Sequence, residues 1–212
     1  MSGKPIRRPL IIRRLGCVEY RPVAERMKAF TGERAPDTCD EVWILEHEPV
    51  YTSGIRNVRR PGKGAPDIPV VKSDRGGEMT YHGPGQLIAY FLLDIRQRGM
   101  GPRLLVEQLE SLVIDALSDY GLVASRRAGA PGVYVEGRKI ASLGLHTTAS
   151  YCYHGLSINV RMDLTPFGHI DTCGIPDLEV TQLADHVEGV SVADTADRLE
   201  RRVLERFVVQ SA

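Results

Sequence analysis

The chain has 212 residues, and its 27 Lys or Arg residues balance 27 Asp or Glu residues, so the formal net charge is zero with neutral His. This balance argues against a general nucleic-acid coat, because phosphate contacts need a net basic surface. A content of 42% hydrophobic and 25% charged residues is typical of globular rather than disordered chains. The length favours one domain, expected to span residues 1–212.

The sequence also argues against a membrane-spanning protein and against a secreted one. No apolar run approaches about eighteen residues, so no membrane-spanning helix is predicted. The basic first nine residues lack an apolar core, so they are not expected to be a secretory signal. The cysteines Cys17, Cys39, Cys152 and Cys173 are widely spaced, which indicates a reduced, cytoplasmic protein in which each is first interpreted as a small buried hydrophobe.

The first half of the chain predicts strands with one early helix. Residues 9–15 are expected to form a strand, and apolar side chains at helical spacing from Tyr20 to Phe30 predict an amphipathic helix. Residues 41–46 and 86–93 predict two more strands, and residues 70–71 lead toward a glycine turn. Residues 54–69 are rich in Pro, Gly and basic side chains and predict a surface loop.

The second half adds two helices and a hairpin. Pro102 is expected to open a helix that Gly121 ends. Residues 133–135 and 139–145 predict a hairpin, and residues 151–160 a further strand. Ser191 with Asp194 resembles a capping box for a final helix. Because several strands are joined by hairpins rather than crossover helices, we expect an α+β (mixed α/β) domain.

The densest motif is RGGEMTYHGPGQ, residues 75–86, with four glycines between two predicted strands. Glycine lets the backbone approach a ligand closely, and Arg75 is suited to clamp a phosphate or carboxylate. The plainer interpretation is a long polar hairpin loop. Neither a Walker loop nor a dinucleotide fingerprint is present, so nucleotide binding is not indicated.

A second motif, GRKIASLG, covers residues 137–144. Strand alternation places Lys139, Ala141 and Leu143 on one face. A lysine just after a β-turn is usually solvated. The functional alternative is that Lys139 lies in a partly apolar pocket, where burial lowers its proton affinity and suits it to acid–base work.

A third motif, residues 165–176, places Cys173 in a loop-like stretch beside Gly174. An exposed thiol becomes a nucleophile when a neighbouring cation or base stabilises its thiolate. The candidates for that neighbour are His82, His154, His169 and Lys139. The Cys and His residues lack the second half of a zinc site, so no metal site is predicted.

Taken together, these segments resemble the octanoyltransferase family of the biotin/lipoate protein ligase superfamily. The resemblance is carried in order by HEPVYT (47–52), RGG and TYHGPGQL within 75–87, GRKIASLG (137–144), YHGLSINV (153–160), PF (166–167) and Cys173-Gly174, and it continues to residues 180–181. It implies a biotin/lipoate protein ligase-like single domain, with a mixed, mostly antiparallel sheet flanked by helices.

The resemblance also implies an activity. An octanoyl group would move from octanoyl-acyl carrier protein to a specific lysine of lipoyl domains, the first step of endogenous protein lipoylation, with no cofactor. The implied acceptors are E2 subunits of 2-oxoacid dehydrogenases and the H protein of glycine cleavage. Cys173 matches the position that carries the acyl thioester, and Lys139 matches the partner that lowers the pKa of Cys173 and shuttles protons. A cytoplasmic monomer without nucleic-acid or membrane partners is expected.

The implied acyl-binding residues fall in three of these motifs. They are Arg75, Gly76, Gly77, Glu78, Met79, Thr80, Tyr81, His82, Ser142, Leu143, Gly144, Gly155, Leu156 and Ser157. Backbone N–H groups around Gly174 or Leu143-Gly144 are expected to stabilise the oxyanion. The basic loop residues Arg56, Arg59, Arg60 and Lys63 are either solvated or dock the acidic acyl carrier protein.

Two rival functions stay open at this point. One is an ATP-dependent lipoate ligase of the same fold, which would form an adenylate and would not need a nucleophilic cysteine. The other is a catalytically inactive module that binds acylated domains. Cys173 together with the Lys139 motif favours the transferase.

Overall fold

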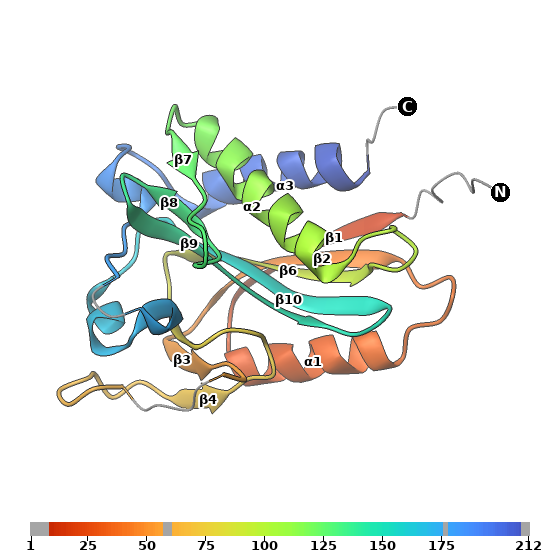
Figure 1. The fold of residues 1–212 in the computed structure, drawn as a ribbon, viewed down its shortest axis with the longest axis horizontal. Helices are drawn as coiled ribbons and strands as arrows, with labels where there is room; N and C mark the ends of the chain where they lie inside the picture. Colours follow the sequence, from red (N-terminus) through yellow and green to blue (C-terminus); the bar gives the residue numbers. More distant parts are fainter. Residues whose placement is uncertain (1–8, 57–60, 176–177, 209–212) are drawn as a thin grey trace.

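A sheet of seven strands forms the centre of the molecule (Figure 1). The computed structural model describes residues 9–56, 61–175 and 178–208, and the Cys173 side chain also lies outside what it describes. The sheet has the order β1-β2-β6-β10-β9-β8-β7, and a second, smaller sheet has the order β4-β3-β5. Most neighbouring strands are antiparallel, while β1 with β2 and β3 with β4 are parallel. The expected mixed, mostly antiparallel sheet is confirmed.

The elements have the following bounds. The strands are β1 (Leu10–Val18), β2 (Asp40–His47), β3 (Val50–Ser53), β4 (Val70–Lys72), β5 (Met79–His82), β6 (Gln86–Asp94), β7 (Ala124–Ser125), β8 (Val133–Val135), β9 (Arg138–Thr147) and β10 (Tyr151–Asn159). The helices are α1 (Tyr20–Gly32), α2 (Pro102–Ser118) and α3 (Val192–Phe207), with the short 3-10 helices η1 (Thr165–His169), η2 (Thr172–Gly174) and η3 (Leu183–Asp185). Among the described residues, no helix combines the length and the apolar character needed to cross a membrane.

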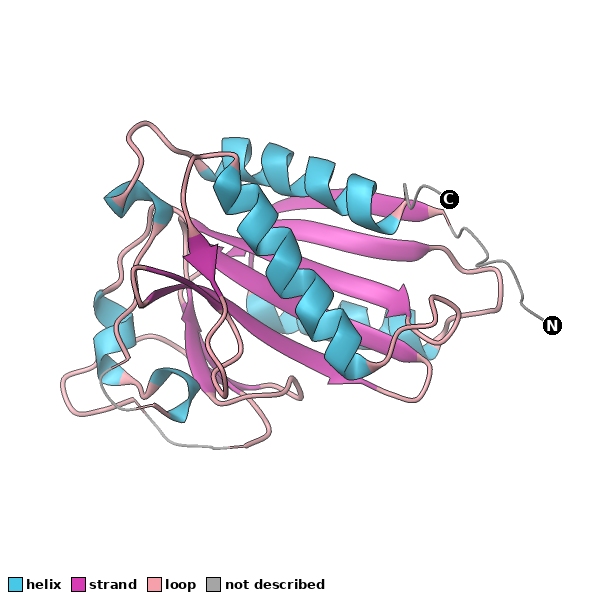
Figure 2. Cartoon of the chain, turned by 45° about the horizontal axis from the view of Figure 1, so that its top comes forward, coloured by secondary structure: helices cyan, strands magenta, loops and turns pink. Residues whose placement is uncertain are grey.

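Helices cover both faces of the large sheet. α2 and α3 lie side by side on one face (Figure 2), and α1 lies on the opposite face (Figure 1). α1 buries Tyr20, Val23 and Met27 at the spacing that the sequence predicts. Because β6 is central and covered on both faces, all of its residues are buried, which explains its nearly continuous apolar sequence.

Local sequence signals set the ends of several elements. Glu136 and Gly137 both have positive φ, 51° and 80°, as a two-residue hairpin turn between β8 and β9 requires. The Ser191 hydroxyl accepts a hydrogen bond from the Asp194 N–H at 3.1 Å and caps α3. The Asp194 carboxylate, however, binds the Tyr120 hydroxyl and Arg198, so it serves tertiary packing as well as the helix end.

The smaller sheet corrects the predicted path of the chain. β3 was not among the predicted strands, and β5 lies inside the glycine-rich motif, whose plainer interpretation was a loop. β5 pairs with β3 antiparallel, with Thr80 opposite Thr52. Tyr81 packs against Tyr51 and Phe167 in a separate apolar cluster that stabilises this sheet. Such short strands become stable only when paired, so local sequence carries little signal for them.

The interpretation of every cysteine as buried is wrong for Cys17. Its side chain is exposed on the edge strand β1, and Cys39 is partly exposed. Cys152 is buried in β10, where its thiol donates to the Phe91 carbonyl at 3.4 Å. Every residue of β1 is exposed or partly exposed, because less of the protein packs around this edge strand than around a central strand.

Gly155 is required for β10 to lie against β6. A Cβ atom at this position would lie 2.1 Å from the Ala89 carbonyl oxygen and 3.0 Å from Phe91 Cδ2. We therefore expect Gly155→Ala to lower the free energy of unfolding by about 1–3 kcal/mol, as overpacking does. Urea denaturation tests this, with Gly32→Ala as control because a Cβ there meets nothing within 4 Å. Equal stability of the two variants would contradict the close approach.

Candidate functional site

A cavity of about 330 Å³ lies beside β9 and β10, with one wall formed by the glycine-rich segment. This volume is within the range of small-molecule sites. All predicted acyl-binding residues except Tyr81 line it. Tyr81 packs in the apolar cluster of the small sheet instead, against Tyr51 and Phe167.

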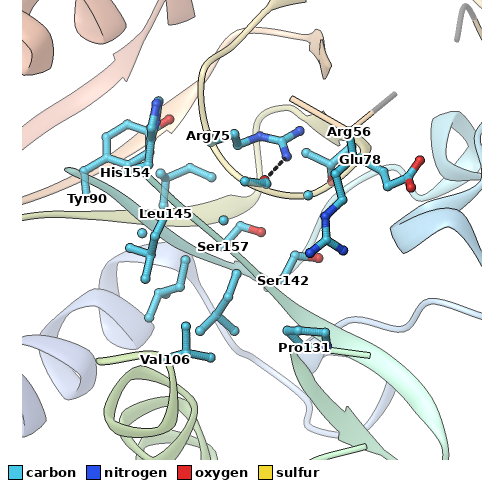
Figure 3. Close-up of a pocket in the computed structure, with 18 of the residues that line it drawn as sticks. Arg56, Arg75, Glu78, Tyr90, Val106, Pro131, Ser142, Leu145, His154 and Ser157 are labelled. Carbon is cyan, nitrogen blue, oxygen red and sulfur yellow. Dashed lines mark hydrogen bonds between the residues drawn. The ribbon is translucent and has the colours of Figure 1, made fainter. Parts of the chain in front are cut away.

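The cavity has two chemically different ends (Figure 3). Arg56 and Glu78 lie at one end, and Tyr90 and His154 lie at the other. Leu145 of β9 lies next to the Tyr90 and His154 end, Ser157 and Ser142 lie between the two ends, and Val106 lies on the side of α2. The cavity thus combines apolar wall from α2 and β9 with polar groups along its other side.

The Arg75 guanidinium holds the protein backbone. Its Nη2 donates to the Thr52 carbonyl at 2.7 Å and to the Thr52 hydroxyl at 2.8 Å, and its Nη1 donates to the Gly76 carbonyl at 3.1 Å. Arg75 is 8% exposed. These bonds join β3 to the glycine-rich segment, so Arg75 helps to hold the cavity wall that it also lines. Clamping an anion would require it to give up some of these partners.

Lys139 is buried, with 1% of its surface exposed, so the solvated alternative is wrong. Its Nζ donates to the Pro131 carbonyl at 2.7 Å and lies 5.5 Å from the centre of the Tyr134 ring. The pairing of β8 with β9 shifts register between Val133 and Tyr134, so the strict alternation predicted for residues 139–143 is interrupted. Lys139, Ile140 and Ala141 are consequently all buried.

The turn that contains Cys173 is tied to the same region. η2 carries Cys173, and the preceding Thr172 is buried and lines the cavity. Gly174 has φ +68°, and a Cβ there would lie 2.9 Å from Glu78 Oε1. Beyond η2, the chain returns to β9, where the Lys139 N–H donates to the Glu179 carbonyl and the Thr181 N–H donates to the Lys139 carbonyl, each at 2.9 Å.

Strand geometry distinguishes the candidate oxyanion donors. The Thr148 N–H bonds to the Tyr151 carbonyl at the β9–β10 turn, and the Leu145 carbonyl accepts from the Gly76 N–H at 2.8 Å. In an antiparallel pair, backbone groups alternate in direction, so those of Leu143 point away from β10 and those of Gly144 toward it. The Gly174 N–H donates to the Asp171 carbonyl at 3.0 Å within its own turn. This favours Leu143 over Gly144 and Gly174.

A cluster of aromatic and imidazole rings lies around the Tyr90 and His154 end of the cavity. Tyr20 stacks on His82, and both lie against His47. The His47 Nδ1 lies 2.8 Å from the Val18 carbonyl and its Nε2 lies 2.7 Å from the Tyr90 hydroxyl, which fits a neutral ring. Burial lowers the pKa of His47 to about 4 and that of His82 well below its usual range.

His154 has a strained backbone conformation within β10. Its φ is +62° within β10, and the ladder with β6 skips residues 153 and 154. Its Nε2 lies 2.8 Å from Asp74 Oδ1, and burial keeps its pKa below the usual value despite that carboxylate. Burial favours a raised pKa for Asp74, but hydrogen bonds from His154, Tyr153 and Lys28 lower it.

Two buried polar atoms of cavity-lining residues, His154 Nδ1 and Thr80 Oγ1, have no hydrogen-bond partner among the described residues.

Because these buried histidines are neutral in the folded protein, we expect its free energy of unfolding to depend on pH. A folded-state pKa of about 4 for His47, against about 6.5 when unfolded, means that only the unfolded chain binds a proton between those pH values. The free energy of unfolding should therefore be highest above about pH 6.5. It should fall as the pH decreases below that value, by up to about 1.4 kcal/mol per pH unit for each such histidine. Urea midpoints at about pH 7.5, 6 and 5 measure this, and His47→Gln should reduce the slope. A stability independent of pH over that range would contradict neutral buried rings.

Cys152 and Cys17 are poor nucleophiles in this structure. Burial raises the pKa of Cys152 to about 12, and partial desolvation with the nearby Glu46 and Glu48 raises the pKa of Cys17, although its side chain is exposed. A nucleophile needs the opposite shift. Among the described residues, no group of three or more His, Cys, Asp or Glu side chains is arranged to hold a metal ion.

Several cavity residues were absent from the sequence prediction. They are Tyr20, Arg56, Ile88, Tyr90, Pro102, Val106, Gly129, Pro131, Leu145, Thr147, His154 and Thr172. Three of them had a signal: His154 was one of four candidate neighbours of Cys173, Arg56 belongs to the basic loop, and Thr172 lies in the third motif. The His154 ring is hydrogen-bonded to Asp74, and its relation to the Cys173 side chain lies outside what the structure describes. Within the basic loop, Arg56 and Lys63 are exposed, and Arg59 and Arg60 lie outside the described residues.

Comparison with other sequences identifies the family. The lipoyl protein ligase A/B catalytic domain model matches residues 23–204. An octanoyltransferase of Azoarcus sp. (strain BH72) is 50% identical over 199 residues, which cover 92% of this chain and 87% of that protein. An octanoyltransferase of Thiobacillus denitrificans is 51% identical over 198 residues, covering 92% of this chain and 91% of that protein.

Solved structures support the fold. A lipoate protein ligase from Thermoplasma acidophilum has a TM-score of 0.72 at 16% identity, covering 93% of this chain and 84% of the other. A biotin protein ligase from Aquifex aeolicus has a TM-score of 0.56 at 15% identity, covering 94% and 69%. The expected biotin/lipoate protein ligase-like fold is thereby confirmed. On its sequence, the chain belongs to the octanoyltransferases of the lipoyl protein ligase A/B catalytic domain family, enzymes that transfer octanoyl groups in protein lipoylation.

Proposed function

We propose that this chain, acting as a single catalytic domain in the cytoplasm, transfers octanoyl from octanoyl-acyl carrier protein to a lysine of lipoyl domains through a thioester on Cys173. One observation carries the proposal. The Pro131 carbonyl that binds Lys139 Nζ and the residue preceding Cys173, Thr172, belong to the lining of one cavity. A buried cation and a turn bearing a thiol beside one apolar cavity are what acyl transfer through a thioester needs.

The chemistry balances without a nucleotide. In the first half-reaction, the Cys173 thiolate attacks the donor carbonyl, the C–S bond of the donor breaks, and the departing thiol takes its proton from the Lys139 ammonium. In the second, the neutral amine of the acceptor lysine forms a C–N bond as the Cys173 C–S bond breaks. Lys139 receives the proton of that amine, and Cys173 returns as a thiolate. Transfer from thioester to amide is downhill, so it needs no ATP.

The cavity suits the acyl chain and its reacting carbonyl. Leu143, Leu145 and Leu156 supply apolar wall, and burial of each CH₂ group contributes about 0.8 kcal/mol. The N–H of Leu143, which points away from β10, is our candidate for the oxyanion donor.

An intact-mass experiment tests this function. The enzyme is incubated with octanoyl-acyl carrier protein without ATP and then analysed by mass spectrometry and peptide mapping. We expect one octanoyl adduct on Cys173 that disappears when a lipoyl domain is added, with the adduct then on the domain. Formation of an octanoyl adenylate that depends on ATP would favour the ligase instead. Binding of acylated domains with neither adduct nor turnover would favour the inactive module.

The donor protein is proposed to dock on the basic loop that leads from the cavity end at Arg56. Acyl carrier protein is acidic, and opposite charges raise association rates at low ionic strength. Reversing Arg56 and Lys63 together with Arg59 and Arg60 should slow acylation of Cys173 severalfold at low salt and reduce its salt dependence. The rate of Cys173 acylation is measured in quenched time courses at several salt concentrations. An unchanged rate at low salt would place the docking surface elsewhere.

A further inference from the structure

The ammonium of Lys139 is positioned by a loop as well as by its own strand. Lys139 Nζ donates to the Pro131 carbonyl at 2.7 Å. The next residue, Gly132, has φ +141°, and a Cβ there would lie 2.5 Å from Lys139 Cε and 2.8 Å from Lys139 Nζ. The loop therefore packs directly on the end of the lysine side chain, and a shift of Pro131 or Gly132 moves the partner of the ammonium.

Glu110 of α2 holds this loop in place. Its Oε1 accepts a hydrogen bond from the Gly132 N–H at 3.0 Å, and its Oε2 lies 3.0 Å from Arg126 Nε. Arg126 is itself attached to α2, because it donates to the Glu107 carbonyl and the Ser111 hydroxyl. Both carboxylate oxygens of Glu110 are thus occupied, one toward the loop and one toward the surface.

A carboxylate is unusual at this place in α2. Glu110 is 6% exposed and lies between Leu109 and Leu112 on the helix, both fully buried. Burial of a carboxylate costs free energy unless its oxygens are bonded. A residue that served only to pack α2 on the sheet would be apolar, like its neighbours. The bond to Gly132 is therefore the feature that distinguishes this position.

We infer that Glu110 is a positioning residue for Lys139: through the Gly132 N–H it fixes the Pro131 carbonyl against the lysine ammonium. The inference rests on the proposed function, in which that ammonium favours the Cys173 thiolate. A carbonyl oxygen bonded to an ammonium stabilises its charged form. Without the bond to Glu110, the loop is free to move, the ammonium loses an aligned acceptor, and less Cys173 is present as thiolate.

The test measures the thiolate directly and without donor protein. Alkylation of Cys173 by iodoacetamide is followed by peptide mapping from about pH 5 to 10 in the full-length chain. We expect Glu110→Leu to slow alkylation at pH 7 by about fivefold, the equivalent of one lost hydrogen bond, and to move the pH profile upward. Glu110→Gln should stay close to the wild type, because its amide oxygen still accepts from Gly132 and it loses only the ion pair with Arg126 on the surface side. Glu107→Gln, whose side chain is bonded to Arg103 at the surface one turn away, is the matched control.

The outcomes distinguish a failure of the role inferred for Glu110 from a failure of the proposed function. If Glu110→Gln is as impaired as Glu110→Leu, or if Glu110→Leu keeps the wild-type profile, the positioning role is overturned. Lys139→Met is measured in parallel. If it changes the alkylation profile of Cys173 while Glu110→Leu does not, only the role of Glu110 fails. If Lys139→Met leaves the profile unchanged, the pairing of Lys139 with Cys173 fails, and the inference fails with it. Glu110→Ala replaces Glu110→Leu if the latter does not give the far-ultraviolet spectrum of the folded protein.

Discussion

Lys139→Ala is expected to lower the rate of octanoyl transfer by roughly 10²–10⁴-fold, the usual contribution of a positioned acid–base group. The reason is that Lys139 supplies the charge that stabilises the thiolate and the amine that takes the proton of the acceptor. Some loss of stability is expected, because the change leaves a cavity and an unpaired Pro131 carbonyl, so the rates are compared on protein whose far-ultraviolet spectrum shows that it is folded. The measurement is the rate of adduct formation on Cys173 and the rate of its discharge to a lipoyl domain.

The neighbouring residue offers the control. Arg138 is next to Lys139 in β9, and its guanidinium binds Glu136 at the surface. Arg138→Ala should keep the wild-type transfer rate. If Lys139→Ala also kept full transfer, the proposed acid–base role would be wrong.

Cys173→Ala should abolish both the adduct and the transfer, since no bond to the octanoyl carbonyl can then form. The expected loss is complete within detection, because Cys17, Cys39 and Cys152 are not among the residues that line the cavity. In addition, burial raises the pKa of Cys152 to about 12. Intact mass with donor, followed by transfer to a lipoyl domain, measures both steps.

Cys17→Ser is the matched control for that experiment. It removes an exposed thiol and should leave the adduct and the rate unchanged. Full transfer by Cys173→Ala would exclude a covalent enzyme intermediate on this residue. Together with full transfer by Lys139→Ala, it would exclude the proposed pair of residues altogether.

The order of the large elements was predictable because each has a strong local signal. α1 and α2 follow the helical spacing of their apolar residues, and the hairpin at Glu136 and Gly137 follows from turn chemistry. The start of α3 after Ser191 was equally predictable from its capping residue. The small sheet was not, since β3 and β5 contain four residues each and are defined by pairing between distant segments.

For the site, motifs predicted which segments meet but not what each side chain does there. Arg75 was considered as a ligand clamp, which stays a prediction; in the structure it lines the cavity while its guanidinium joins Thr52 to Gly76. Lys139 was weighed against a solvated alternative, because burial depends on the 131–132 loop that is not part of its motif. Pro131 and Tyr90 carry no local signal at all, since they reach the cavity only through the packing of the fold.

The segment that carries Cys173 leaves the sheet and returns to it at one place. Asn159, at the end of β10, donates to the Thr181 carbonyl at 2.9 Å, and residues 179–181 then bond to Lys139. A loop closed at its base in this way can change in length at small entropic cost. Phe167 and Thr172 within it pack against the small sheet and the cavity, so a segment grafted here from a protein of this architecture would have to restore those two contacts while varying the turn between them.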